Sequence, residues 1–234
     1  MTQETMNKYI IITAILLVAV ILLFELTNLD NIIQKSFYNF SDKTWILSED
    51  DILLDRIFYS GFKKLFITFS LIVFFITIFI KQFSIFKAYK KGLIILSLSL
   101  IFVPSLGLLK NITNMPCPFN VIEFGGKYPE VKLFESYPKD LTPITTLKCY
   151  PAGHATMGFS LMALYFLFKT QRNRNIALGI GITIGVLTGG YKILIGDHFL
   201  SHTLVTMLAA WLIILLIVKL VNKIKKLEDR TSSL

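Results

Sequence analysis

The chain has 234 residues, of which 54% are hydrophobic and twenty are phenylalanine. A soluble core of this length could not bury so many apolar side chains, so the composition excludes an ordinary soluble domain and predicts an all-α polytopic membrane protein. The net charge of +9 lies mostly in short segments between apolar runs. That pattern indicates membrane topology rather than nucleic-acid binding, which would need a soluble basic face.

Six apolar segments have about the length that crosses a bilayer, roughly 20 residues or slightly fewer. They run from Tyr9 to Leu26, Leu65 to Ile80, Gly92 to Leu109, His154 to Phe168, Ile176 to Ile195 and Phe199 to Val221. The first is not followed by a small-residue cleavage pattern, so we expect an uncleaved span. The sequence therefore predicts a six-transmembrane-helix bundle that forms one membrane domain over residues 1–234.

Basic residues gather in three of the segments outside these spans. Residues 81–91 hold four lysines and no acid, residues 169–175 hold one lysine, two arginines and no acid, and the tail after Lys219 is also basic. By the positive-inside rule these segments are cytoplasmic, and so are both termini. The connections over residues 28–64 and 111–150 are then the outer loops.

The first outer loop contains apolar residues at helical spacing. They are Leu29, Ile32, Ile33 and Phe37, followed by Ile52, Leu53, Ile57 and Phe58. Such segments are typical of interfacial helices, with Trp45 and Tyr59 at head-group depth. The alternative is that they only fill space over the bundle.

The two cysteines, Cys117 and Cys149, both lie in the second outer loop. A compartment outside the cytoplasm is one in which disulfides persist. A bridge would hold together the two polar stretches beside which the cysteines lie, and two unpaired thiols are the alternative.

Ionisable side chains gather in three polar stretches at the ends of the predicted spans. Lys110 ends the third span, His154 begins the fourth, and Lys192, His198 and His202 lie around the junction of the fifth and sixth. All three stretches fall at the outer face of the predicted bundle. Ionisable groups at membrane depth are the best indication of chemistry in such a chain.

The turn Pro151-Ala152-Gly153-His154 is suited to an anion. Gly153 permits close approach of the backbone, and free amides at a helix start attract negative charge. An ordinary helix start with an interfacial histidine is the alternative.

His198 and His202 are four residues apart and share one face of a helix, so one ring can orient the other. A histidine that attacks phosphorus must be neutral and held through its second nitrogen. Lys192 is placed to balance phosphoryl charge. A two-histidine metal site is the alternative, but no further Glu or Cys ligand lies nearby, so we expect no metal.

The three stretches resemble the signature of the type 2 phosphatidic acid phosphatase superfamily, which reads K-x6-R-P, then P-S-G-H, then S-R-x5-H-x3-D. Here the parts read Lys110 through Cys117-Pro118, then Pro151 to His154, then Tyr191-Lys192 through His198 to His202. The resemblance extends over about residues 92–211, the expected phosphatase-like core.

This resemblance implies roles for the matching residues. His198 would be the nucleophile that forms a phosphohistidine, His154 would protonate the leaving alkoxide, and His202 would orient His198. The phosphate would be bound by Lys110, Lys192 and the amides of Ala152 and Gly153. The mechanism implied needs no metal and no cofactor.

Besides Tyr191 in place of serine, four signature positions differ in this chain. They are Cys117 and Lys192 in place of arginine, Ala152 in place of serine, and His202 in place of aspartate. Lysine keeps the charge without the bidentate fork, and cysteine loses the charge. A neutral His202 stabilises an imidazolium less than a carboxylate does. Asp197, Lys127 and Lys148 are the residues that could compensate.

The resemblance and the topology together predict an inner-membrane lipid phosphatase whose active site faces the exterior. Family substrates include phosphatidic acid, phosphatidylglycerol phosphate, isoprenyl diphosphates and lipid A phosphates, so the expected partners are such a lipid and the membrane itself. A phosphotransferase with the same intermediate is one alternative, and a degenerate lipid-phosphate-binding protein is the other. The sequence does not identify the lipid or the oligomeric state.

Overall fold

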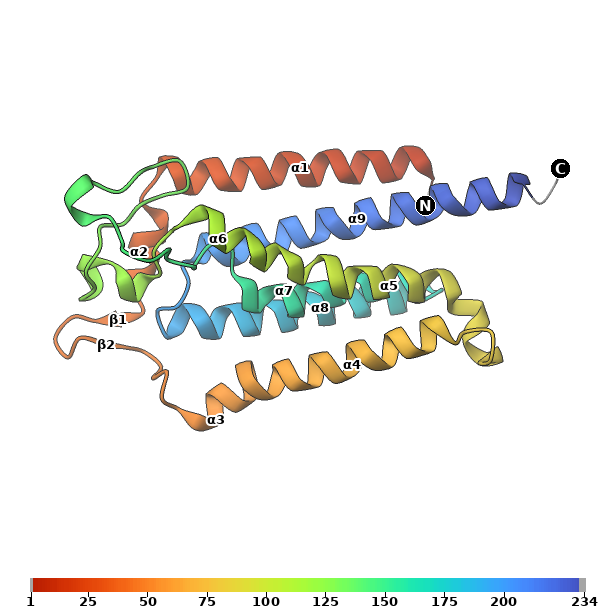
Figure 1. Ribbon diagram of the computed structural model, residues 1–234, viewed down its shortest axis with the longest axis horizontal. Coiled ribbons are helices and arrows are strands. Elements are labelled where there is room, and N and C mark those ends of the chain that lie inside the picture. The colour runs from red at the N-terminus through yellow and green to blue at the C-terminus, as the bar shows by residue number, and fades with distance from the viewer. Residues whose placement is uncertain (1, 232–234) are drawn as a thin grey trace.

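The computed structural model describes residues 2–231, with side chains up to residue 227. Residue 1 and residues 232–234, the extremes of the predicted single domain, lie outside the described part. The long helices are α1 (Gln3–Leu26), α4 (Gly61–Ile78), α5 (Lys90–Phe102), α8 (Gln171–Leu194) and α9 (Leu200–Thr231). They run along one common axis (Figure 1). The predicted all-α class is confirmed, because the described residues contain only one two-stranded ribbon besides helices and loops.

Shorter elements connect these helices. They are α2 (Leu29–Lys35), β1 (Tyr38–Asn39), β2 (Thr44–Trp45), α3 (Ile52–Asp55), η1 (Arg56–Ser60), η2 (Ser84–Tyr89), η3 (Pro104–Leu109), α6 (Lys110–Thr113), η4 (Pro118–Asn120), η5 (Ile122–Phe124), η6 (Lys139–Leu141), α7 (Gly153–Ser160) and η7 (Leu161–Phe166). The strands β1 and β2 pair antiparallel, with Tyr38 opposite Trp45.

Five segments of the described chain are long and apolar enough to cross a membrane. They are Gln3–Leu26, Ile52–Ile78, Ser84–Asn120, Gln171–Leu194 and Leu200–Leu227. The second begins well before the predicted residue 65, because α3 and η1 continue directly into α4. Residues 52–58 are therefore the start of this long segment, and their position at the membrane interface stays a prediction.

The predicted fourth span, residues 154–168, is not among these five segments. It consists of α7 followed by the 3-10 turn η7. At about 1.5 and 2.0 Å per residue the two pieces together extend about 24 Å, less than the roughly 30 Å hydrocarbon core. The six-span count therefore stays a prediction.

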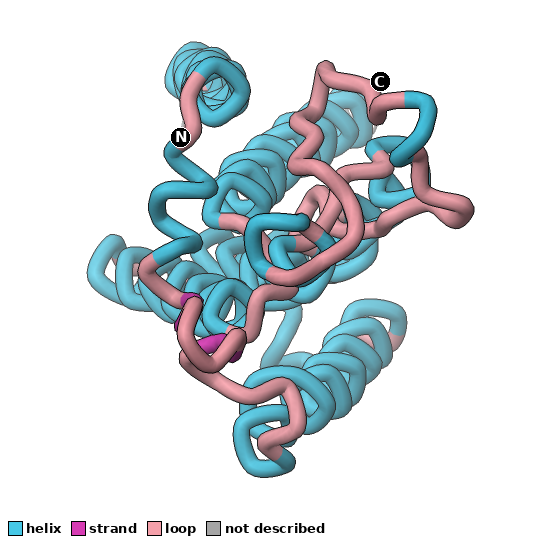
Figure 2. The backbone as a smooth tube through the Cα atoms, turned by 90° about the vertical axis from the view of Figure 1, so that its left-hand side faces the viewer, coloured by secondary structure: helices cyan, strands magenta, loops and turns pink. Residues whose placement is uncertain are grey.

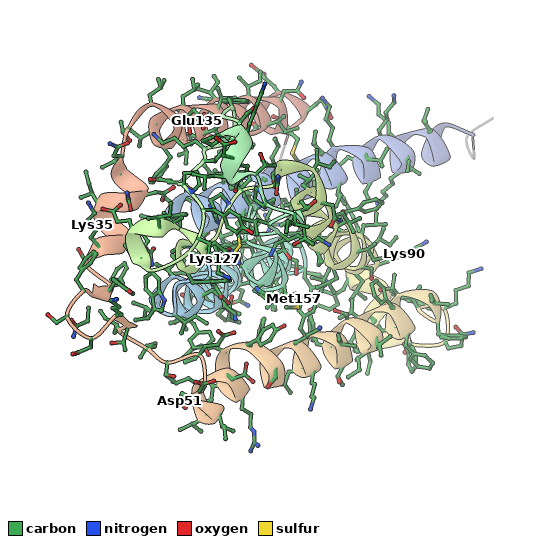
Figure 3. The ribbon with its side chains drawn as sticks, turned by 60° about the vertical axis from the view of Figure 1, so that its left-hand side comes forward. Lys35, Asp51, Lys90, Lys127, Glu135 and Met157 are labelled. Atoms are coloured by element: carbon green, nitrogen blue, oxygen red, sulfur yellow. A yellow bond between two sulfur atoms is a disulfide. The ribbon has the colours of Figure 1, made fainter. Side chains whose placement is uncertain are left out.

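The helix α7 lies at the centre of the bundle, where Met157 is labelled in Figure 3. It packs against both α8 and α9. A Cβ on Gly158 would meet the backbone of Gly185, and Phe159 is completely buried. Small residues at these crossings let the helix backbones approach closely, which is how membrane helices associate.

The connections lie at the two ends of the bundle. Both ends of the described chain and the turn between α4 and α5 lie at one end, and α2, β1, β2 and α6 lie at the other (Figure 1). Viewed from the second end, loops cross over the helix ends (Figure 2). We call the first the basic end, because residues 81–91 lie there, and the second the loop end.

The first outer loop is attached firmly to the helices beneath it. The buried Gln34 of α2 donates its side-chain amide to the carbonyl of Ile193 at 3.0 Å, and Asp30 accepts the Ser201 amide of α9 at 2.9 Å. Trp45 lies over Gly196, whose φ of +80° a residue with a side chain would rarely adopt. The loop thereby fixes the turn between α8 and α9.

Candidate active site

The polar stretches singled out in the sequence meet at the loop end of the bundle. Lys110 is the first residue of α6, and His154 is the second residue of α7. Lys192 lies in the last turn of α8, His198 lies in the turn that follows, and His202 lies in the first turn of α9. Five residues from four elements thus form one cluster.

His198 and His202 form a buried pair. His198 is only 2% exposed and His202 is completely buried, and their two Nδ1 atoms are 3.5 Å apart. In the described part of the chain His198 Nε2 has no hydrogen-bond partner. If His198 Nδ1–H donates to His202 Nδ1, the lone pair of His198 lies on this free Nε2 atom. This tautomer is the one a nucleophilic imidazole requires.

The environment keeps His198 uncharged. Burial, followed by the neighbouring His202 ring and the positive charges of Lys110 and Lys192, lowers the pKa of His198 well below its usual value. A neutral imidazole retains the lone pair that an imidazolium has lost. The protein therefore holds His198 in its nucleophilic form at neutral pH.

His154 faces this pair from the start of α7. Its ring centroid is 5.9 Å from that of His198, and its buried Nδ1 has no partner among the described residues. Both Lys110 and Lys192 are close enough for their charges to act on His154. The two histidine rings therefore lie close together, with both lysines near them.

The two lysines of the cluster are held in different ways. Lys192, exposed by only 5%, pairs with Asp197, with Nζ 2.6 Å from Oδ2. Lys110 lies over Gly153, where an added Cβ would be 3.2 Å from Nζ. Asp197, which could have replaced the orienting aspartate, is thus paired with Lys192. The residue facing His198 Nδ1 is His202.

The backbone amides at the start of α7 are not equivalent. The amide of Ala152 donates to Thr206 Oγ1 at 3.0 Å, and the Thr206 hydroxyl donates to the His202 carbonyl at 2.6 Å. The Ala152 amide therefore already has an acceptor inside the protein. Ala152 gives α7 no side-chain cap, so the first amides of the helix, including that of Gly153, lack this partner.

Cys117 and Cys149 are joined by a disulfide, with their Cα atoms 5.2 Å apart. The backbone of Cys149 lies beside His202, and the ring of Tyr150 meets His202 edge-on at 5.1 Å. Cys117, which stands where the family signature has arginine, thus connects the second outer loop to the chain next to the histidine pair. It contributes no charge.

The other basic residues considered from sequence lie apart from the cluster. Lys127 and Lys148 are exposed, and in the described residues neither forms a salt bridge with the site. Figure 3 shows Lys127 in the loop end. A different lysine, Lys63 of α4, is near enough to act electrostatically on His154. It is the third cation of the site.

Tyr59 is a site residue that the sequence reasoning placed only at head-group depth. Its ring meets His154 edge-on at 4.6 Å, and Lys192 Nζ lies 4.5 Å from its centroid. Tyr59 belongs to the π-helix η1, a rare element that is frequent at functional sites. The position of Tyr59 at the outer end of a span was the one available signal, because no spacing in the sequence links it to His154.

The fold and the cluster together define a class of protein, a helical membrane protein with a buried cluster of histidines and lysines at one end of the bundle. The family model of the PAP2 superfamily matches residues 91–226, more than half of the chain, and the protein belongs to this superfamily. This finding confirms the resemblance seen in the sequence, and members of the family are phosphatases. No curated protein and no solved structure matches the chain.

Proposed function

We propose that the protein is an integral membrane lipid phosphatase that hydrolyses a phosphate monoester or diphosphate of a lipid head group. The observation that carries the proposal is the free Nε2 atom of His198, which is buried, uncharged and held through Nδ1. A structural histidine would be expected to use both nitrogens when it is buried, because an unpaired polar atom costs free energy. Each of the three histidines of the cluster leaves one ring nitrogen without a partner among the described residues. His198 and His202 face each other through Nδ1, and His198 is the one whose ring faces that of His154.

The reaction then proceeds in two steps. His198 Nε2 attacks phosphorus and forms a P–N bond, while the P–O bond to the lipid breaks. His154, which enters this step as the imidazolium with the phosphate anion bound beside it, gives its proton to the leaving oxygen and becomes neutral. The Nδ1–H of His198 is stabilised by His202 as the imidazole acquires positive charge. Water next attacks phosphorus, loses a proton to His154 and breaks the P–N bond, which returns His198 to its starting form.

The phosphate oxygens are bound by the positive side of the cluster. Lys110, Lys192 and the Gly153 amide supply donors, and Lys63 adds charge at the rim. Ala152 acts on the site by keeping α7 attached to α9 through Thr206 rather than by donating to phosphate. Phosphate must compete with Asp197 for Lys192, because that lysine is already paired. No step in this scheme requires a metal ion.

The substrate is proposed to be a lipid because the cluster lies at the ends of long apolar helices, at head-group depth. In the proposed topology six segments cross the inner membrane, α7 and η7 form the short fourth crossing, and both termini are cytoplasmic. The basic segments then face the cytoplasm, as the positive-inside rule requires, and the histidines face the exterior. In this arrangement α2 lies at the outer interface.

The test is phosphate release by purified protein from phosphatidic acid, phosphatidylglycerol phosphate and an isoprenyl diphosphate, without added metal, beside His198→Ala. We expect release that the variant lacks, and a single-turnover reaction with labelled phosphate should mark wild-type protein only. Equal release by both proteins would contradict the mechanism. Labelling without release would identify a phosphotransferase, and binding without labelling would identify a lipid-phosphate-binding protein.

A further inference from the structure

A cavity of about 560 Å³ opens at the basic end of the bundle, between the start of α5 and the end of α9. We propose that it binds one anionic phospholipid of the adjacent leaflet. The cavity shares no lining residue with the histidine cluster at the loop end. The proposal therefore does not depend on the phosphatase activity.

The walls of the cavity change from charged to apolar with depth. On α5, Lys91, Ile94 and Leu98 line it at spacings of three and four residues, which is one face of a helix. On α9, Lys225 lies at the same end as Lys91, and Leu220 lies deeper. The seven helical steps from Lys91 to Leu98 extend about 10 Å along the helix. A phospholipid has the same order, with a charged head above apolar chains.

Four lysines surround the opening, and among the side chains that the structure describes, which end at residue 227, no acidic one lines it. They are Lys87, Lys90, Lys91 and Lys225. The like charges of Lys91 and Lys225 act on each other across the cavity, so an anion placed between them would relieve repulsion as well as gain attraction. Basic pockets between membrane helices are typical sites for anionic head groups.

The lysines at the opening and the apolar wall below them together favour one class of ligand. A free phosphate ion would use the lysines but not the wall formed by Ile94, Leu98 and Ile224, whereas a zwitterionic lipid would use the wall but gain little from the lysines. An anionic glycerophospholipid uses both. Phosphatidylglycerol has a phosphodiester and no terminal phosphate, so it is a suitable probe that the proposed histidine chemistry does not consume.

The experiment is native mass spectrometry of the full chain in detergent with equimolar dioleoyl-phosphatidylglycerol and dioleoyl-phosphatidylcholine. We expect wild-type protein to retain one phosphatidylglycerol in preference to phosphatidylcholine. Lys91→Gln with Lys225→Gln should lower that preference by about fivefold for each lysine removed. The matched control is Lys81→Gln with Lys223→Gln, which removes the same charge at the same end from residues that do not line the cavity.

A second variant tests the apolar wall with all charges in place. Leu98→Trp fills the deep part of the cavity and should lower retention of phosphatidylglycerol, and a thermal unfolding curve verifies that each variant is folded. Adding inorganic phosphate distinguishes the source of binding, because a site for free phosphate would lose the lipid to it. Equal retention of both lipids by wild-type protein, an equal loss in the control, or wild-type behaviour of Leu98→Trp would each overturn the proposal.

Discussion

The two sides of the histidine cluster are built in different ways. On the inner side, His198 and His202 are buried and face each other through Nδ1, and Thr206 links the carbonyl of His202 to the amide of Ala152. On the outer side, Lys192 is paired with Asp197 and covered by Tyr59. His198, the proposed nucleophile, is thus already oriented without substrate, whereas Lys192, proposed to bind phosphate, is engaged with Asp197. Attack is prepared in advance, and phosphate binding requires an exchange of partners.

The largest effect in this comparison is expected from His154, whose ring faces that of His198. We call the side formed by His198 and His202 the fixed side, and the side formed by Lys192 and Asp197 the adjustable side. His154→Ala removes the proposed proton donor and should lower kcat by about 100-fold or more for a lipid with a poor leaving group. An aryl phosphate needs little protonation of its leaving group, so its hydrolysis should be affected much less. Steady-state kinetics with both substrates measures this difference. An equal loss on both would show that His154 has another role.

The next effect concerns His202, which defines the fixed side. His202→Leu removes the acceptor of the His198 Nδ1–H bond and should lower kcat about tenfold, the equivalent of one hydrogen bond of roughly 1.4 kcal/mol. His202→Asp is the matched variant, because a carboxylate accepts the same bond and stabilises the imidazolium better. It should preserve or raise kcat, and complete loss of turnover in this variant would mean that His202 does not orient His198.

A smaller effect is expected on the adjustable side, from Asp197. Asp197→Asn releases Lys192 from its ion pair, so KM should fall about fivefold, equivalent to about 1 kcal/mol, while kcat changes little. The unpaired lysine should also lower the melting temperature, and added phosphate should restore it. Kinetics and thermal unfolding with and without phosphate test both statements. An unchanged KM would show that Asp197 does not compete with substrate.

The smallest effect is expected from the ring that covers Lys192. Tyr59→Leu removes the contacts with Lys192 and His154 and should lower kcat/KM about threefold or more, since a cation–π contact contributes about 0.5–2 kcal/mol and Lys192 is buried. Tyr59→Phe keeps the ring and serves as the control. If both variants lose the same activity, the hydroxyl and not the ring would be the important group.

The sequence predicted the fixed side of the site better than the adjustable side. The meeting of the polar stretches follows from their positions at span ends. The two rings do face each other, but the shared helix face predicted from their spacing of four residues is wrong, because His198 lies in the turn before α9 begins at Leu200. The pairing of Lys192 with Asp197 depends on the turn at Gly196, whose left-handed backbone a residue pattern does not reveal. The contact of Tyr59 with His154 joins elements almost a hundred residues apart.

The same limit applies to the fold. Long apolar segments such as α1 and α9 were predictable because hydropathy alone identifies them. The split of residues 154–168 into α7 and η7 was not, because it depends on close packing around Gly158 and Gly185, which only the assembled bundle defines. The second span was also predicted to begin too late, at residue 65 instead of Ile52. The charged residues Asp55 and Arg56 lower the local hydropathy, although the helix continues through them.

Trp45 gives the protein a built-in optical probe. The chain contains two tryptophans, and Trp45 lies directly over Gly196. Gly196 directly precedes Asp197 and His198 in the sequence. In a Trp211→Phe background the fluorescence emission comes from this indole alone. After rapid mixing with a lipid phosphate, the change in Trp45 fluorescence would report when Lys192 exchanges Asp197 for phosphate. Comparing that time with the appearance of product would order the two events without an added label.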